Sequence, residues 1–149
     1  MAVADSLELL NATLINASIV IVVVLIHNEA LLRLSHQLSG MHQSHHFRLV
    51  TGVLGILAIH TLQVWIFALA FYFMHHSEAW GELSGNFGGT MLDCVYFSFT
   101  TFTTLGYGDI EATGVLRFLT GIEALTGLVL ITWSASFLFV EMQRYWPSR

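Results

Sequence analysis

The sequence contains no lysine, and its aspartate, glutamate and arginine residues together make up only 10% of the chain. An average soluble domain carries about 25% charged residues, whereas 55% of this chain is hydrophobic. Because a soluble fold of this composition would expose a largely apolar surface to water, the scarcity of charge favours a membrane protein surrounded by lipid. The net charge of −5 argues against a nucleic acid partner, since phosphates would repel an acidic protein.

Cysteine and basic N-terminal residues are also scarce. Cys94 is the only cysteine, which excludes a disulfide within one chain and leaves the redox compartment open. A cleavable signal peptide begins with a positively charged stretch, but the first charged residues here are Asp5 and Glu8. We therefore expect the N-terminal segment to be retained.

Three apolar segments are each long enough to supply the roughly 20 residues of a transmembrane helix. They span residues 9–34, 49–74 and 115–140. Because backbone polar groups cannot stay unpaired in hydrocarbon, each segment is predicted to be helical. Polar residues interrupt the first segment, so a helix lying at the membrane surface is its alternative. This segment also lacks the repeated arginines of a voltage sensor.

A different pattern separates the second and third segments. Residues 75–90 are polar and glycine-rich, which predicts an exposed loop. Residues 91–103 are apolar and threonine-rich, long enough for a short helix but too short to span a membrane. A short helix followed by a glycine-bearing extended stretch fits a re-entrant loop, which is tolerated at membrane depth only where protein or water covers it.

The distribution of charge predicts an orientation. Four of the five arginines fall on one side of a three-span topology: Arg33, Arg48, Arg144 and Arg149. The other side collects acidic residues, namely Asp5, Glu8, Glu78, Glu82, Asp93, Asp109 and Glu111. By the positive-inside rule the N-terminus faces outward, the C-terminus is cytoplasmic and the re-entrant loop opens outward.

Two glycines allow residues 104–108 to line an ion path with backbone oxygens. Conducting potassium without sodium requires rings of oxygens that replace the water shell of the ion. Successive carbonyls can form such rings if the backbone alternates between right- and left-handed conformations, and Gly106 and Gly108 adopt the latter without steric cost. Thr104 can add a hydroxyl oxygen, and Tyr107 would face away from the axis. One chain supplies a quarter of each ring, so the site requires four subunits.

The run TTFTTLGYGD, residues 100–109, resembles the signature of the pore domain of the tetrameric potassium channel family, and the resemblance extends over residues 49–140. It implies an all-α membrane protein of the bacterial type, in which residues 1–47 form an additional N-terminal transmembrane helix and a cytoplasmic linker. Residues 48–149 would form the ion-channel pore domain, with an outer helix at 49–74, a re-entrant pore helix at 91–103, a selectivity filter at 104–108 and an inner helix at 115–140.

The same resemblance implies a function, which is passive potassium conduction by a homotetramer in a bilayer, with no reaction catalysed. Potassium would be the permeant ion, with no organic cofactor and no soluble ligand. The expected location is the inner (plasma) membrane of a bacterium. The ion would be coordinated by the five filter residues, Thr104, Leu105, Gly106, Tyr107 and Gly108.

Filter support and gating roles also follow from the resemblance. Asp109 would hold the filter from its outer side. Thr100 and Phe97 occupy positions where members of the family often carry a glutamate that pairs with this aspartate and a tryptophan that braces the filter tyrosine. Gly127 resembles the flexible glycine of a gating hinge.

Five further residues of the third segment have two interpretations each. Glu123 is an ionisable group at membrane depth, which makes it a functional-site hypothesis. It either hydrogen-bonds the back of the pore helix and couples the inner helix to the filter, or it only fixes helix packing. The others recur at helical spacing and either line the inner pore or face lipid and protein: Leu128, Ile131, Ala135 and Phe139.

Other functions stay open at this point. A non-selective cation channel would share the architecture, although Tyr107 between two glycines argues against it, and a non-conducting accessory subunit is a further alternative. From a different class, His27 and His60 would ligate a haem in an electron-transfer subunit. The remaining histidines respond to pH or metal, or are simply solvated: His36, His42, His45, His46, His75 and His76.

Overall fold

The computed structural model describes residues 2–41, 45–77 and 80–145. This part of the chain forms helices α1 (Ala2–Gly40), α2 (His45–His75), α3 (Met91–Phe102) and α4 (Leu116–Tyr145), with strands β1 (Leu83–Gly85) and β2 (Ile110–Ala112). Three residues of the charge and histidine patterns lie outside the described residues, namely His42, Glu78 and Arg149.

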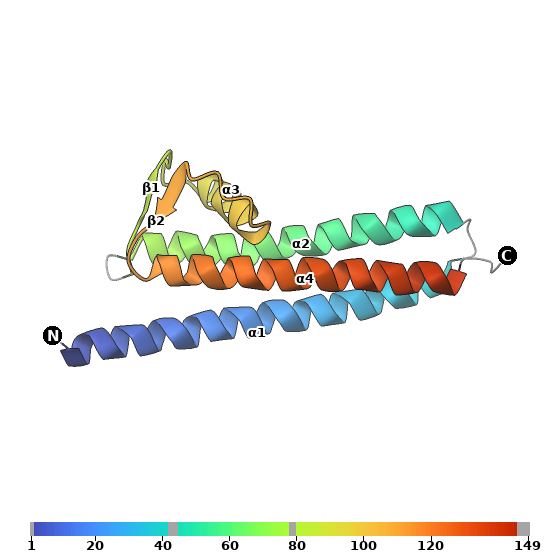
Figure 1. Ribbon diagram of the computed structural model, residues 1–149, viewed down its shortest axis with the longest axis horizontal. Helices are drawn as coiled ribbons and strands as arrows, with labels where there is room; N and C mark the ends of the chain where they lie inside the picture. Colours follow the sequence, from blue (N-terminus) through green and yellow to red (C-terminus); the bar gives the residue numbers. More distant parts are fainter. Residues whose placement is uncertain (1, 42–44, 78–79, 146–149) are drawn as a thin grey trace.

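The three long helices lie side by side along the long axis of the molecule, and α3 and the strands pack near one end of them (Figure 1). The N-terminus lies at this end, whereas the α1–α2 connection and the end of α4 lie at the opposite end. Three helical stretches of the described chain are long and apolar enough to cross a membrane: Leu10–Gly40, His46–His75 and Leu116–Arg144. The predicted all-α membrane fold with an extra N-terminal helix is confirmed.

Each long helix extends beyond the apolar segment that predicted it. Helix α1 continues on both sides of residues 9–34, because helical hydrogen bonds do not require apolar side chains. Hydropathy marks only the part of a helix that lipid can surround. Helix α3 ends one residue before the predicted boundary, at Phe102.

Strands β1 and β2 form a short antiparallel pair that was not predicted from the sequence. The pair aligns Leu83 with Ala112 and Gly85 with Ile110. Strands of three residues are too short to show the alternation of apolar and polar residues that indicates a strand. The pairing ties the loop before α3 to the segment that follows residues 104–108, so both connections of α3 are held at one end of the molecule.

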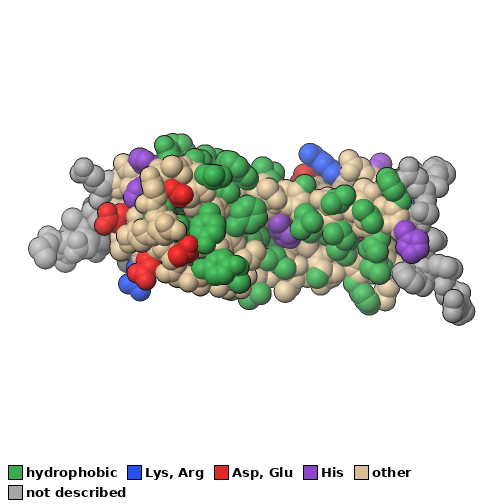
Figure 2. Space-filling model, turned by 90° about the horizontal axis from the view of Figure 1, so that it is seen from above, with side chains coloured by type: hydrophobic (Ala, Val, Ile, Leu, Met, Phe, Trp, Pro, Cys, Tyr) green, Lys and Arg blue, Asp and Glu red, His purple; other side chains and the backbone are tan. Residues whose placement is uncertain are grey.

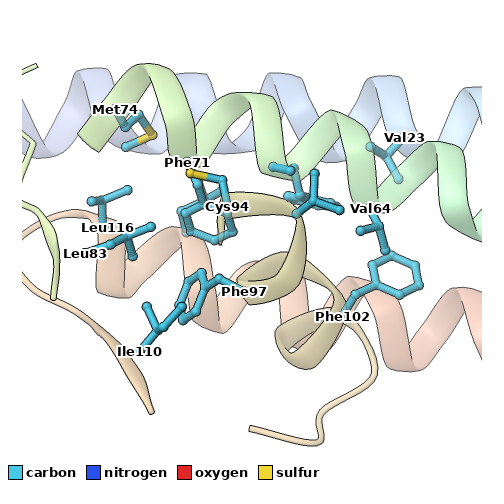
Figure 3. Close-up of a cluster of buried hydrophobic side chains, with 14 of the residues drawn as sticks. Val23, Val64, Phe71, Met74, Leu83, Cys94, Phe97, Phe102, Ile110 and Leu116 are labelled. Carbon is cyan, nitrogen blue, oxygen red and sulfur yellow. The ribbon is translucent and has the colours of Figure 1, made fainter. Parts of the chain in front are cut away.

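The main hydrophobic core lies where α2, α3, α4 and the strands meet. Figure 3 shows Phe97 of α3 close to Phe71 of α2, and their rings meet edge to face with centroids 5.0 Å apart. Most large apolar side chains of the long helices are instead exposed. Figure 2 shows such side chains over the middle of the molecule and acidic side chains gathered at the end that carries α3, a distribution that fits a protein surrounded by lipid.

Candidate functional site

Helix α3 positions the candidate site, and its start is fixed by a capping box. The hydroxyl of Thr90 accepts a hydrogen bond from the backbone N–H of Asp93, whose carboxylate accepts from the N–H of Thr90 and of Gly88 at 3.1 and 3.0 Å. The hydrogen bonds from Thr90 hold the pKa of Asp93 below its usual value. A helix with both orphan donors satisfied in this way begins at a defined residue.

The stretch after α3 is hydrogen-bonded to the last turn of the helix. The N–H of Thr104 donates to the carbonyl of Thr101 at 2.9 Å. The N–H groups of Leu105 and Gly106 both donate to the carbonyl of Thr100, at 2.8 and 3.1 Å. The position of α3 therefore sets the position of residues 104–106.

Residues 104–108 alternate in backbone handedness. Thr104, Gly106 and Gly108 have φ values of +58°, +50° and +75°. Left-handed conformations at every second residue were predicted for the two glycines. Thr104 was not predicted to share them, because a β-branched residue at positive φ is a rare outlier and such strain costs about 1–3 kcal/mol.

In a single chain, no other part of the described structure covers this stretch. Every residue from 103 to 108 is exposed, and the side chain of Tyr107 is 67% accessible. A Cβ added at Gly106 or Gly108 would meet no atom within 4 Å. Irregular backbone at membrane depth requires protein or water around it, so the open side fits further subunits or a water-filled path.

Asp109 is held from two directions. The phenol of Tyr96 on α3 donates to its carboxylate at 2.9 Å, and its carbonyl accepts from the N–H of Asn86 at 2.8 Å. The hydrogen bond to the carboxylate raises the pKa of Tyr96. Tyr96 was missed in the sequence, because the spacing of a phenol and a carboxylate thirteen residues apart does not show that the chain returns to α3 just before β2.

The other two residues expected to support the filter, Thr100 and Phe97, have different contacts from Asp109. The hydroxyl of Thr100 donates to the carbonyl of Phe97 within α3, at 2.9 Å. Thr100 contacts the stretch through its backbone carbonyl rather than through its side chain. Phe97 packs against Phe71 in the core (Figure 3).

The structure brings two predicted residues of α4 onto α3. Glu123 is completely buried, and its Oε1 lies 2.5 Å from the hydroxyl of Ser98. A Cβ added at Gly127 would lie 2.1 Å from the carbonyl oxygen of Phe102. Helix α4 runs without a break through this position, so Gly127 is a point of close approach between two helices.

The remaining predicted residues of α4 form an uncovered stripe. Leu128, Ile131, Ala135 and Phe139 are all exposed within one chain. An exposed apolar stripe of this kind can line a pore or face lipid.

His27, which is buried, and His60, which is half-buried, belong to a polar network that joins all three long helices. Gln63 of α2 contacts the Nδ1 atoms of His27 and His60 at 3.0 and 2.8 Å, and Nε2 of His60 lies 3.1 Å from the hydroxyl of Ser134. The imidazole rings are stacked with centroids 5.6 Å apart. A haem ligated by both histidines would have to lie between their imidazole rings. Rings stacked at this distance leave too little space for it, so these residues do not fit the haem alternative. No group of three or more potential metal-ligating His, Cys, Asp or Glu side chains occurs in the described residues.

A family model described as an ion channel matches residues 59–144, which is more than half of the chain. The match includes most of α2, all of α3, the stretch after it and nearly all of α4, but not α1. No curated protein and no solved structure matches the chain.

Proposed function

Because this chain belongs to the ion-channel family and carries three membrane-spanning helices, we propose that four copies form a potassium-selective channel. Conduction is passive, and no reaction is catalysed. The permeation path runs along residues 104–108, whose carbonyl oxygens replace the water shell of the ion. Potassium is the permeant ion, and the assembly is a homotetramer.

The observation that carries the proposal is the alternating backbone at Thr104, Gly106 and Gly108. Alternation of left- and right-handed residues turns successive peptide units so that their carbonyls can face one side. An isolated strand of this kind offers too few oxygens to coordinate a dehydrated ion. Four strands around one axis complete the rings, and this explains why the stretch is exposed in a single chain.

Electrostatics supports a cation on this path. The C-terminal end of α3 precedes the stretch directly, and a helix carries roughly half a negative elementary charge at that end. Acidic side chains gather at the same end of the molecule (Figure 2). We assign this end to the outside, because Arg33, Arg48 and Arg144 lie toward the opposite end, and the positive-inside rule places arginine in the cytoplasm.

The experiment is a reversal-potential measurement on the purified protein in planar bilayers. With a tenfold potassium gradient and sodium balancing the charge, the reversal potential is expected near the potassium value of about 59 mV. A reversal potential near zero would contradict potassium selectivity and favour a non-selective cation channel.

Two glycine variants make the test specific to the filter. Gly108→Ala places a side chain at φ +75° inside the path, and we expect it to abolish selectivity. Gly89→Ala is the matched control, since Gly89 has φ +79° and the same open surroundings but precedes α3. Equal effects of the two substitutions would contradict the assignment of residues 104–108.

A further inference from the structure

We propose that Glu123 is a positioning residue for the filter, which holds α3 on α4 through Ser98 so that selectivity depends on this contact. The inference rests on the proposed function and adds to it a residue outside the path of the ion. Two contacts between α3 and α4 support it. One is the hydrogen bond between Ser98 and Glu123, and the other is the close approach of Gly127 to the backbone of Phe102.

The contacts occur on consecutive helical turns. Glu123 and Gly127 are four residues apart on α4, and Ser98 and Phe102 are four residues apart on α3. The first pair is joined by a hydrogen bond of 2.5 Å, and the second pair meets where only glycine fits. Residues four apart lie on one face of a helix, so the two contacts fix both the distance between the helices and the rotation of α3.

The residue whose carbonyl holds the filter lies between the two contacts on α3. Thr100, whose carbonyl accepts the N–H groups of Leu105 and Gly106, lies between Ser98 and Phe102. A shift of α3 relative to α4 therefore moves these acceptors. The first residues of the filter move with them.

The hydrogen bond also extends to α2. The hydroxyl of Ser98 lies 2.9 Å from the carbonyl of Val64, and both Ser98 and Glu123 are completely buried. Water cannot replace a partner lost at this depth. Because an apolar side chain could fill the same space without the cost of burying a carboxyl group, the bond to Ser98 accounts for a glutamate at residue 123.

The test compares Glu123→Ala, Glu123→Gln and the unchanged protein by the reversal potential measured with potassium on one side of the bilayer and an equal concentration of sodium on the other. This potential does not depend on how many channels are folded, so a loss of stability alone leaves it unchanged. We expect Glu123→Ala to lower the potassium-to-sodium permeability ratio about tenfold, a shift of about 59 mV. Glu123→Gln keeps a side chain that can bond Ser98 and is expected to retain the ratio.

Two further variants provide a control and a second way to break the contact. Glu29→Ala removes another glutamate of a membrane-spanning helix, which pairs with Arg33 and is half-exposed, and should leave the ratio unchanged. Ser98→Ala breaks the same contact from α3 and should reproduce the shift if Glu123→Ala yields no channel. An unchanged ratio in Glu123→Ala or Ser98→Ala, or a shift in Glu123→Gln as large as in Glu123→Ala, overturns the inference. An unselective parent protein contradicts the proposed function instead.

Discussion

Replacing Gly127 with alanine would test the contact between α4 and α3 directly. The new Cβ would lie 2.1 Å from the carbonyl oxygen of Phe102 and 2.9 Å from its carbonyl carbon. Ordinary contact begins at 3.4 Å, so the helices would have to separate by about 1.3 Å. The obstructing atoms belong to the backbone of Phe102, so a change of side-chain rotamer cannot relieve the clash. Overpacking costs about 1–3 kcal/mol, and alanine returns about 1 kcal/mol through its higher helix propensity.

We therefore expect Gly127→Ala to lower the free energy of unfolding by up to about 2 kcal/mol. The midpoint of thermal unfolding in detergent measures this loss, and the reversal potential measures the accompanying change at the filter. Gly121→Ala is the control on the same helix, because a Cβ there meets nothing within 4 Å. If the two variants were equally stable and equally selective, close approach at residue 127 would not be required and the reasoning would be refuted.

Three further substitutions test separate contacts. Tyr96→Phe removes the donor to the carboxylate of Asp109 and should make potassium currents decay faster during sustained recording; an unchanged time course would contradict a role in holding the filter. Gln63→Leu removes the buried link between the two histidine rings and should lower the free energy of unfolding by about 1 kcal/mol, which thermal unfolding would show; an unchanged midpoint argues against the link. Asp93 has a lowered pKa because of its hydrogen bonds with Thr90, so its stabilisation is complete above about pH 4, the unfolded value, and is lost as the pH falls through the lower folded value. Asp93→Asn should flatten this part of the pH dependence of thermal unfolding, and identical profiles in the two proteins would count against the capping box.

The long helices of the fold could be predicted from composition, because a lipid environment restricts the kind of sequence that can span it. Hydrocarbon requires long apolar helices, and residues 9–34, 49–74 and 115–140 correspond to α1, α2 and α4. The short helix at 91–103 was also predicted, since a polar loop and a glycine-bearing stretch bound it. Strands β1 and β2 were missed because three residues do not show a period.

The contacts around residues 104–108 were less accessible from sequence. Glycine permits positive φ wherever it occurs, so Gly106 and Gly108 indicated an unusual backbone. Thr104 adopts positive φ where its own N–H and those of the next two residues are hydrogen-bonded to the last turn of α3, which the sequence does not show. Tyr96 contacts Asp109 through the path of the chain in space, which no local pattern records. Gly127 was read as flexible, and the structure shows a second reason for glycine at this position, which is the missing side chain against Phe102.

The central claim is that backbone oxygens of residues 104–108 from four copies coordinate dehydrated potassium along one axis. A density map of the protein in lipid nanodiscs, recorded in potassium and again in sodium, tests it most directly. We expect four chains around a fourfold axis, with a row of density peaks between the facing carbonyls that changes when sodium replaces potassium. Chains without a fourfold axis, or residues 104–108 turned away from it with no peaks between them, would contradict the claim.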